Sequence, residues 1–292
     1  VDGLALHIDN YVDIKNERNI EIGIRLKSDI KNENTFYTDL NGFQIIKRTK
    51  YDKLPIQGNY YPVATQIFIE DESKRLTLHT ASPLGGSSLQ SGSMEVILDR
   101  QLTQDDERGL GHGVHDNVLT LNSFSLLLEP RSKPKEATLV ENIPAGYASL
   151  TSHYVSKYLL HPLLTLHPIT TNNGYAKHWN IGGELPCDIE MVNLRSLLAT
   201  KQPGAPHPPS STMALTLHRF GFSCFFPNIG LSCSTSNGKV RLSDLFPATF
   251  SEDVKQMSLS HLYEGVDMGK SYSLSFQPME LYSFKLFISS PN

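Results

Sequence analysis

The chain has 292 residues, of which 39% are hydrophobic and 19% charged, and this composition excludes a disordered chain and a coiled coil. It carries 26 Lys and Arg against 30 Asp and Glu, and no segment is basic enough to follow a phosphate backbone, so no nucleic-acid partner is expected. No window approaches the roughly 18 apolar residues of a membrane span, so no membrane span is expected in this chain. Because the sequence begins at Val1 rather than Met, we expect an upstream part of the same protein.

Alternation of apolar and polar residues predicts strands through most of the chain. The clearest example is Ile20–Lys27, where the alternation runs through the whole segment. Turn-forming pairs such as Asn41-Gly42 separate such segments. The shorter segments of this kind are residues 66–70, 76–79, 94–98, 124–129, 214–220 and 280–288. The pattern predicts a mainly β fold, a largely antiparallel β-sandwich.

A few segments depart from the strand pattern. Apolar residues at helical spacing predict a short helix over Ser149–Leu160, ended by Pro162. Glu129–Glu136 and Lys201–Ser211 are charged or rich in proline, and we expect a connector and an exposed loop there. The strand pattern resumes after residue 185, which predicts a large β-sandwich domain over 1–185 and a smaller β domain over 186–292.

A polar loop, residues 99–111, follows the predicted strand at 94–98. It holds Arg100, Asp105, Asp106 and Arg108 among glycines, and loops at strand ends commonly carry binding groups. Carboxylates and guanidinium groups together complement the hydroxyls of a sugar. A solvent-exposed turn closed by salt bridges is the alternative interpretation. Adjacent carboxylates in one loop do not form a retaining glycosidase pair, which needs two carboxylates about 5 Å apart across a sugar.

The sequence contains no strong catalytic or metal-binding motif. His112 and His115 have a spacing that suggests a metal site, but the flanking glycines do not hold ligands rigidly, so we favour an exposed loop and expect no metal in this chain. There is no phosphate-binding glycine loop and no nucleophile elbow. Spacing alone therefore predicts no catalytic residue here.

The three cysteines are Cys187, Cys224 and Cys233. They are too few for a disulfide-built scaffold and too far apart for a zinc ribbon. From the residues alone, Cys224 and Cys233 either close the short loop between them with a disulfide or are two buried thiols.

Several long segments, in the same order along the chain, resemble one known family. The segments are Phe36–Gln44, Leu54–Pro62, Arg75–Leu78, Gly85–Leu89, the 99–111 loop, Leu185–Asp188, Leu217–Phe222 and Thr235–Val240. Together they resemble the C-terminal half of the class II α-mannosidases, glycoside hydrolase family 38, and most of all its Golgi α-mannosidase II branch.

The resemblance implies an activity and a partner domain. Such enzymes are zinc-dependent retaining α-mannosidases, and the Golgi members trim α1,3- and α1,6-linked mannose from N-glycans. Their zinc ligands, nucleophile and acid/base carboxylate lie in an N-terminal α/β domain, so this chain would need that domain for activity and would bind no zinc itself. The implied fold is a galactose-mutarotase-like supersandwich with a short helix and a smaller C-terminal β domain.

The resemblance also implies roles for particular residues. The 99–111 loop would reach the active site and contribute an arginine that positions the sugar, with Arg100 the first candidate and Arg108 the second. Asp105 and Asp106 would be further substrate-binding residues. The family often has a second arginine where Gln101 stands here, so the choice of arginine stays open.

The cysteines and the cellular compartment follow from the same resemblance. It implies a Cys224–Cys233 disulfide, with Cys187 joined to the upstream part. It implies the Golgi lumen or secretory pathway, with a lysosomal or secreted protein as the alternative. A different class of function is a stand-alone, non-catalytic carbohydrate-binding or structural β-sandwich module.

Overall fold

The computed structural model describes residues 3–105, 107, 109, 111–132, 144–165, 185–198, 209–241, 250–268 and 273–288. The chain divides into two units. Unit 1 comprises the described residues of Val1–Leu166 together with Phe222–Leu231, and unit 2 comprises those of His167–Gly221 and Ser232–Asn292. Every strand pair among the described residues is antiparallel, apart from one isolated parallel bridge.

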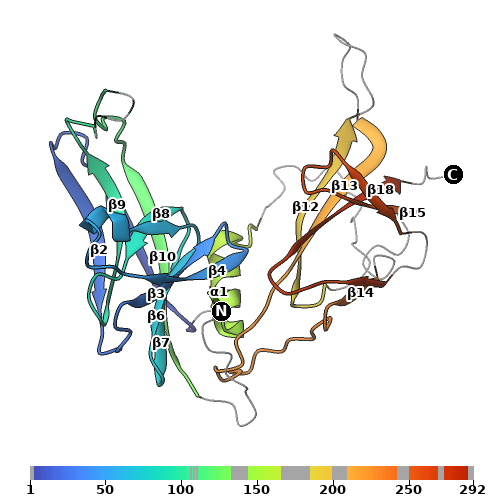
Figure 1. The fold of residues 1–292 in the computed structure, drawn as a ribbon, viewed down its shortest axis with the longest axis horizontal. Helices are drawn as coiled ribbons and strands as arrows, with labels where there is room; N and C mark the ends of the chain where they lie inside the picture. The colour runs from blue at the N-terminus through green and yellow to red at the C-terminus, as the bar shows by residue number, and fades with distance from the viewer. Residues whose placement is uncertain are drawn as a thin grey trace. The chain divides into compact units, whose positions relative to one another are not determined.

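Unit 1 is built from two sheets (Figure 1). The seven-stranded sheet has the order β1 (Leu6–Val12), β10 (Thr120–Pro130), β7 (Lys74–Thr80), β6 (Gln66–Glu70), β3 (Thr35–Leu40), β4 (Gln44–Thr49), β11 (Ala145–Gly146). The four-stranded sheet has the order β2 (Ile20–Lys27), β9 (Ser93–Gln101), β8 (Leu84–Ser87), β5 (Tyr61–Val63), and a short 3-10 helix (Ile56–Asn59) precedes β5.

The two sheets enclose one hydrophobic core. Phe36, Ile67 and Leu78 come from the seven-stranded sheet and Met94 and Val96 from the four-stranded sheet, and each is at most 1% exposed. Strand β2 follows the predicted alternation, with half-buried and exposed residues taking turns along its whole length. The predicted β-sandwich is therefore confirmed, and its closed core is what fixes the strand ends where loops can carry binding groups.

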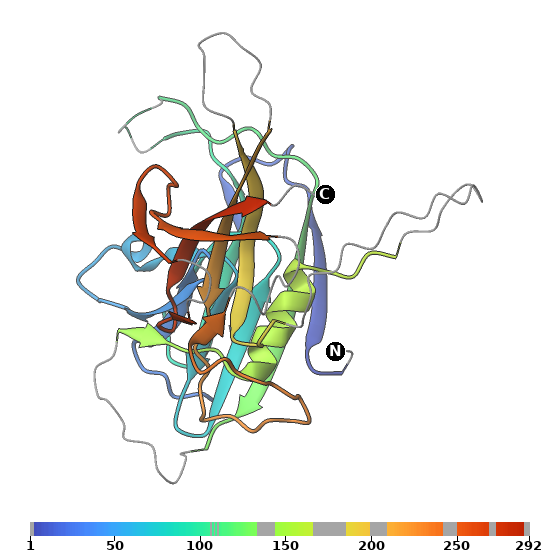
Figure 2. The same cartoon turned by 90° about the vertical axis from the view of Figure 1, so that its right-hand side faces the viewer.

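The predicted helix is present as α1 (Leu150–Leu160). Ser149 caps it by accepting a hydrogen bond from the Ser152 backbone N–H at 2.9 Å. The helix lies against β7 and β10 (Figure 2). Beneath it, His79 Nε2 lies 3.2 Å from Ser152 Oγ, and complete burial lowers the pKa of His79 to about 3.

The connector predicted over Glu129–Glu136 is wrong at its start. Glu129 belongs to β10, is 5% exposed and accepts a hydrogen bond from the Ser149 hydroxyl at 2.6 Å. A charged residue is expected to be exposed, but the hydrogen bond from Ser149, in another element, offsets much of the cost of burying Glu129. Residues 133–136 lie outside the described residues, as do residues 201–208 of the predicted proline-rich loop, whose last residues begin β13.

One segment of the second half of the chain belongs to unit 1. Within Phe222–Leu231, the Phe226 ring lies 4.4 Å from the Arg75 guanidinium carbon, and that carbon also lies 4.0 Å from the Phe68 ring centroid. The domain division predicted at residue 185 placed this segment in the second domain, whereas here it packs on the outer face of the seven-stranded sheet. Apolar periodicity carries no information on such long-range pairing.

Unit 2 has its own sheet and core. Its five-stranded sheet has the order β12 (Ile189–Leu198), β13 (Pro209–Arg219), β18 (Leu281–Ile288), β15 (Phe250–Met257), β16 (Glu264–Asp267), and β14 (Lys239–Arg241) pairs with β17 (Ser273–Ser275). Leu215, Leu217 and Phe284 are among its fully buried residues. Among the described residues of both units, no helix has the length and apolar character needed to cross a membrane.

Candidate functional site

The candidate site begins where β9 ends. Strand β9 pairs with β2 through a register irregularity next to Gly23, and beyond it Arg100 lies opposite Glu21. The Arg100 backbone N–H donates to Asp99 Oδ1 at 2.8 Å. The Arg100 guanidinium forms no hydrogen bond or ion pair with another described residue. The end of β9 therefore presents a guanidinium that no described residue engages.

The loop after Arg100 is closed at its base by a backbone pair. Leu102 N donates to Val114 O at 3.2 Å, and Val114 N donates to Leu102 O at 2.9 Å. A Cβ at Gly113 would lie 1.9 Å from Leu102 O, so only glycine allows the two backbones to approach this closely. The closed conformation of this loop thus depends on Gly113, which has no side chain.

Two asparagines that the sequence analysis did not single out hold the loop. Asn19 Oδ1 accepts hydrogen bonds from the Thr103 backbone N–H at 2.9 Å and the Thr103 hydroxyl at 2.7 Å. Asn117 Nδ2 donates to Asp99 Oδ1 at 2.9 Å and to Arg100 O at 2.8 Å. Asn19 has a φ of 52°, a conformation that asparagine adopts more readily than most residues. Its position just before a strand was the only sequence signal that pointed to this role.

The structure describes one of the three other predicted substrate-binding residues, Asp105. Asp105 uses Oδ1 to accept the Glu107 N–H at 2.9 Å and Oδ2 to accept the Gly111 N–H at 2.7 Å, so its carboxylate folds the loop on itself. Its role as a sugar ligand stays a prediction. Asp106 and Arg108 lie outside the described residues.

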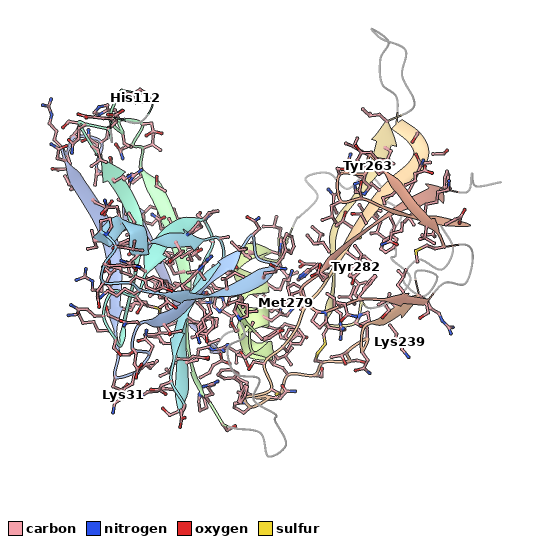
Figure 3. The ribbon with its side chains drawn as sticks, viewed as in Figure 1. Lys31, His112, Lys239, Tyr263, Met279 and Tyr282 are labelled. Atoms are coloured by element: carbon pink, nitrogen blue, oxygen red, sulfur yellow. A yellow bond between two sulfur atoms is a disulfide. The ribbon has the colours of Figure 1, made fainter. Side chains whose placement is uncertain are left out.

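Arg100 borders an open pocket of about 690 Å³. Figure 3 marks this end of unit 1 by His112, at the opposite end from Lys31. The pocket combines apolar walls with a few polar groups, a composition typical of small-ligand sites. Its lining residues are Glu21, Ile56, Gln57, Tyr60, Pro83, Leu84, Gly85, Ile97, Leu98, Asp99, Arg100 and Val114.

A smaller hollow of about 350 Å³ on the same sheet is lined by charged residues. Glu95, 8% exposed, accepts hydrogen bonds from the Tyr60 hydroxyl and from Arg25 Nε. Burial, and then the hydrogen bond to Glu95, raise the pKa of Tyr60 above its usual value. These three side chains form one connected polar group, which we call the Glu95 cluster.

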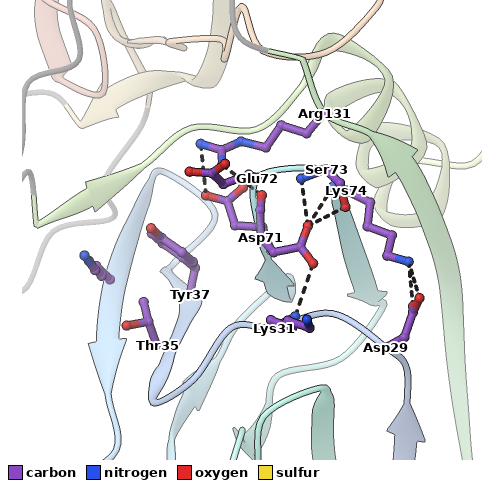
Figure 4. A pocket seen from close by; sticks show the side chains of 11 residues that line it. Asp29, Lys31, Thr35, Tyr37, Asp71, Glu72, Ser73, Lys74 and Arg131 are labelled. Atoms are coloured by element: carbon purple, nitrogen blue, oxygen red, sulfur yellow. Dashed lines mark hydrogen bonds and ion pairs between the residues drawn. The ribbon is translucent and has the colours of Figure 1, made fainter.

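A third pocket, of about 700 Å³, lies at the opposite end of unit 1 (Figure 4). Its acidic groups are already engaged. Both oxygens of Asp29 bind Lys74 Nζ at 2.6 Å, and Glu70 Oε2 lies 2.6 Å from Arg75 Nη2. Asp71 Oδ1 accepts three hydrogen bonds from the turn that follows it. These paired acidic groups belong to the fold of this end of unit 1.

The described residues contain no group of three His, Cys, Asp or Glu side chains that could hold a metal ion. His112 Nδ1 instead lies 2.9 Å from Gly113 O. The residues present in these ranges therefore do not fit a zinc site.

The predicted Cys224–Cys233 disulfide is wrong. Cys233 is bonded to Cys187, at a Cα–Cα distance of 5.5 Å, and Cys224 is free and exposed. The reason lies in the folding of unit 2, where the Cys187 N–H donates to Ser234 O at 3.2 Å and brings the two segments side by side. Cys224 belongs to the segment that packs on unit 1. The bond is internal to this chain, so the expected link from Cys187 to an upstream part is also wrong.

Comparison with known proteins identifies the family of this chain. Residues 1–108, which include Arg100, match the model of the glycosyl hydrolases family 38 C-terminal domain. The chain belongs to this family. It is 42% identical over 293 residues to α-mannosidase 2x of Mus musculus and 40% identical over 295 residues to α-mannosidase 2 of Homo sapiens, in each case over 98% of this chain and 25% of the relative. The family 38 chain thus spans about a quarter of the length of these relatives.

A solved structure shows the same fold. An α-mannosidase from Enterococcus faecalis V583 superposes with a TM-score of 0.50 over 97% of this chain and 27% of that chain, at 11% sequence identity. At this identity the likeness concerns the fold of the family 38 chain and not its specificity.

Proposed function

We propose that this chain is the C-terminal β-sandwich part of a zinc-dependent retaining α-mannosidase that removes α1,3- and α1,6-linked mannose from N-glycans. The observation that carries the proposal is the Arg100 guanidinium, which no described residue pairs with, at a pocket of about 690 Å³ within the residues that match the family domain. The similarity to α-mannosidases over 98% of the chain supports the same activity.

The chemistry is divided between this chain and an upstream part. Because the described residues do not fit a zinc site, zinc, the nucleophile and the acid/base carboxylate are assigned to an upstream catalytic domain. The chain's own contribution is Arg100, whose backbone is held by Asp99 and Asn117 and whose guanidinium, engaged by no described residue, can donate hydrogen bonds to sugar hydroxyls. Such a donor orients the substrate and moves no proton.

The compartment proposed is the Golgi lumen or another part of the secretory pathway. A disulfide between Cys187 and Cys233 supports it, because such bonds persist in oxidising compartments and are rare in the cytosol.

The test is the hydrolysis of an aryl α-mannoside by the longer protein that contains this chain. We expect zinc-dependent activity from the longer protein and none from the 292-residue chain alone. Changing Arg100→Ala in the longer protein should lower kcat/KM on the order of tenfold or more, because one or more charge-assisted hydrogen bonds are lost. Arg241→Ala, an exposed arginine of β14, is the matched control and should leave kcat/KM unchanged. Activity of the isolated chain, or an unchanged Arg100→Ala enzyme, contradicts the proposal.

A second function, glycan binding without hydrolysis, is favoured by the lining of the Arg100 pocket, which combines apolar walls with polar groups and needs no catalytic group to bind a sugar. It predicts that the chain alone binds mannose-containing glycans on an array and that Arg100→Ala abolishes this binding.

A further inference from the structure

The Arg100 pocket and the hollow at the Glu95 cluster adjoin. They share the lining residues Glu21, Tyr60 and Ile97. A glycine lines each of them, Gly85 the pocket and Gly23 the hollow. A Cβ at Gly85 would meet nothing within 4 Å, and Gly23 lies opposite Ile97 in the strand register. The outer face of the four-stranded sheet therefore holds two adjoining hollows, which together we call the depression.

The Glu95 cluster has a fixed geometry and spare hydrogen-bonding capacity. Arg25 and Tyr60 both donate to the nearly buried Glu95 carboxylate, so each side chain is held in one direction. The side chain of Arg25 is 59% exposed, and its terminal nitrogens form no hydrogen bond with another described residue. A fixed guanidinium with free N–H groups is suited to bind two neighbouring hydroxyls of a sugar.

The register of the strands gives the length of the depression. Glu21 and Arg25 lie on the same face of β2, four residues apart, which corresponds to ~13 Å along a strand. Glu21 is the register partner of Arg100, and Arg25 that of Glu95. Arg100 and the Glu95 cluster are thus too far apart to bind one pyranose ring, but they are well placed for two linked rings.

We propose that the Glu95 cluster binds a second sugar ring of the substrate, next to the ring held at Arg100. The Tyr60 and Ile97 side chains provide apolar surface for the C–H face of that ring, and Arg25 provides the hydroxyl donors. This inference rests on the proposed function, because it extends the same site from one sugar to two.

The test compares two substrates in the longer protein that contains this chain. An aryl α-mannoside offers one sugar ring, and a branched mannose pentasaccharide offers several. The double variant Arg25→Met, Glu95→Gln removes both charges together, so that no carboxylate is left buried without its partner. We expect it to lower the ratio of kcat/KM for the pentasaccharide to kcat/KM for the aryl mannoside on the order of tenfold, the value of one charge-assisted hydrogen bond.

The matched control is Lys27→Met, an exposed lysine on the same strand and face that lines neither hollow. It should leave the ratio unchanged. If the double variant fails to fold, as shown by its thermal unfolding, Tyr60→Phe is measured instead and should lower the ratio severalfold. An active wild-type protein whose ratio does not change in the variant overturns this inference alone. A wild-type protein that hydrolyses neither substrate overturns the proposed function as well.

Discussion

The two ends of unit 1 use their charged residues in opposite ways. At the end around the β6–β7 turn, Glu70 binds the buried Arg75, Asp29 binds Lys74, and Asp71 binds the backbone of its own turn. At the other end, the side chains of Arg100 and Glu21 border a pocket and have no hydrogen-bond or ion-pair partner among the described residues.

The difference separates charges that hold the fold from charges that are available to a ligand. A buried charge needs its partner, because the cost of removing it from water is large. An exposed and unpaired charge contributes little to stability, and a ligand can bind it without breaking an existing contact. By this criterion Arg100 is available to a ligand, whereas Asp29, Glu70 and Asp71 are not, although both ends have hollows of similar volume.

The largest expected effect is a difference in the free energy of unfolding between variants of Arg75 and Arg100. Arg75 is 4% exposed and also donates to Tyr147 O at 2.8 Å, so Arg75→Met should cost about 3–5 kcal/mol in the free energy of unfolding. Arg100→Met should change it by no more than about 0.5 kcal/mol. Urea unfolding of the chain measures both. Equal costs for the two variants would remove the distinction between the ends.

The next effect concerns the base of the 99–111 loop. Gly113→Ala places a methyl group against Leu102 O, and we expect a loss of about 1–3 kcal/mol, as for overpacking. Hydrogen exchange should show faster exchange of the Leu102 and Val114 amides. The control is Gly109→Ala, where a Cβ meets nothing within 4 Å and exchange should not change. Unchanged protection in Gly113→Ala would show that the backbone pair does not close the loop.

A smaller effect is the pH dependence at Asp71. Burial acts to raise its pKa, but hydrogen bonds from Ser73 and from the neighbouring backbone outweigh it and lower the pKa to about 2. Because this is below the value of 3.8 for an unperturbed aspartate, Asp71 stabilises the fold above about pH 3.8, and this contribution is lost as the pH falls towards 2. Asp71→Asn should therefore destabilise by about 0.5–1 kcal/mol at pH 6 and by less at pH 2. A pH-independent difference would contradict the assignment.

The smallest effect is spectroscopic and concerns the Arg100 end. Burial and the hydrogen bond to Glu95 raise the pKa of Tyr60, so Glu95→Gln should lower that pKa towards its ordinary value. An ultraviolet titration of tyrosine ionisation measures it, with Tyr60→Phe to identify the signal. If Glu95→Gln leaves the titration unchanged, the Glu95 cluster does not have the geometry described.

Much of unit 1 could be predicted from the sequence, because its strands alternate regularly. β2 and β6 have the predicted bounds, and the helix begins one residue after its predicted start. Arg100 was predicted from its motif and lies at a pocket. Glu129, the last residue of the predicted strand at 124–129, was wrongly counted in the exposed connector as well, because burial of a charge depends on a partner from elsewhere in the fold.

The sequence by itself determined the β class, the positions of β2, β6, β7, β9, β10, β13 and β18 and the loop that carries Arg100, since these depend on local periodicity and on motifs. Only the tertiary structure decided that Cys187 pairs with Cys233, that Phe222–Leu231 joins unit 1, and that Arg25, Tyr60 and Glu95 meet beside the Arg100 pocket. Each of these depends on contacts between residues distant in the chain. Alternation along a strand shows which of its faces is buried, but not which other strand or segment packs beside it.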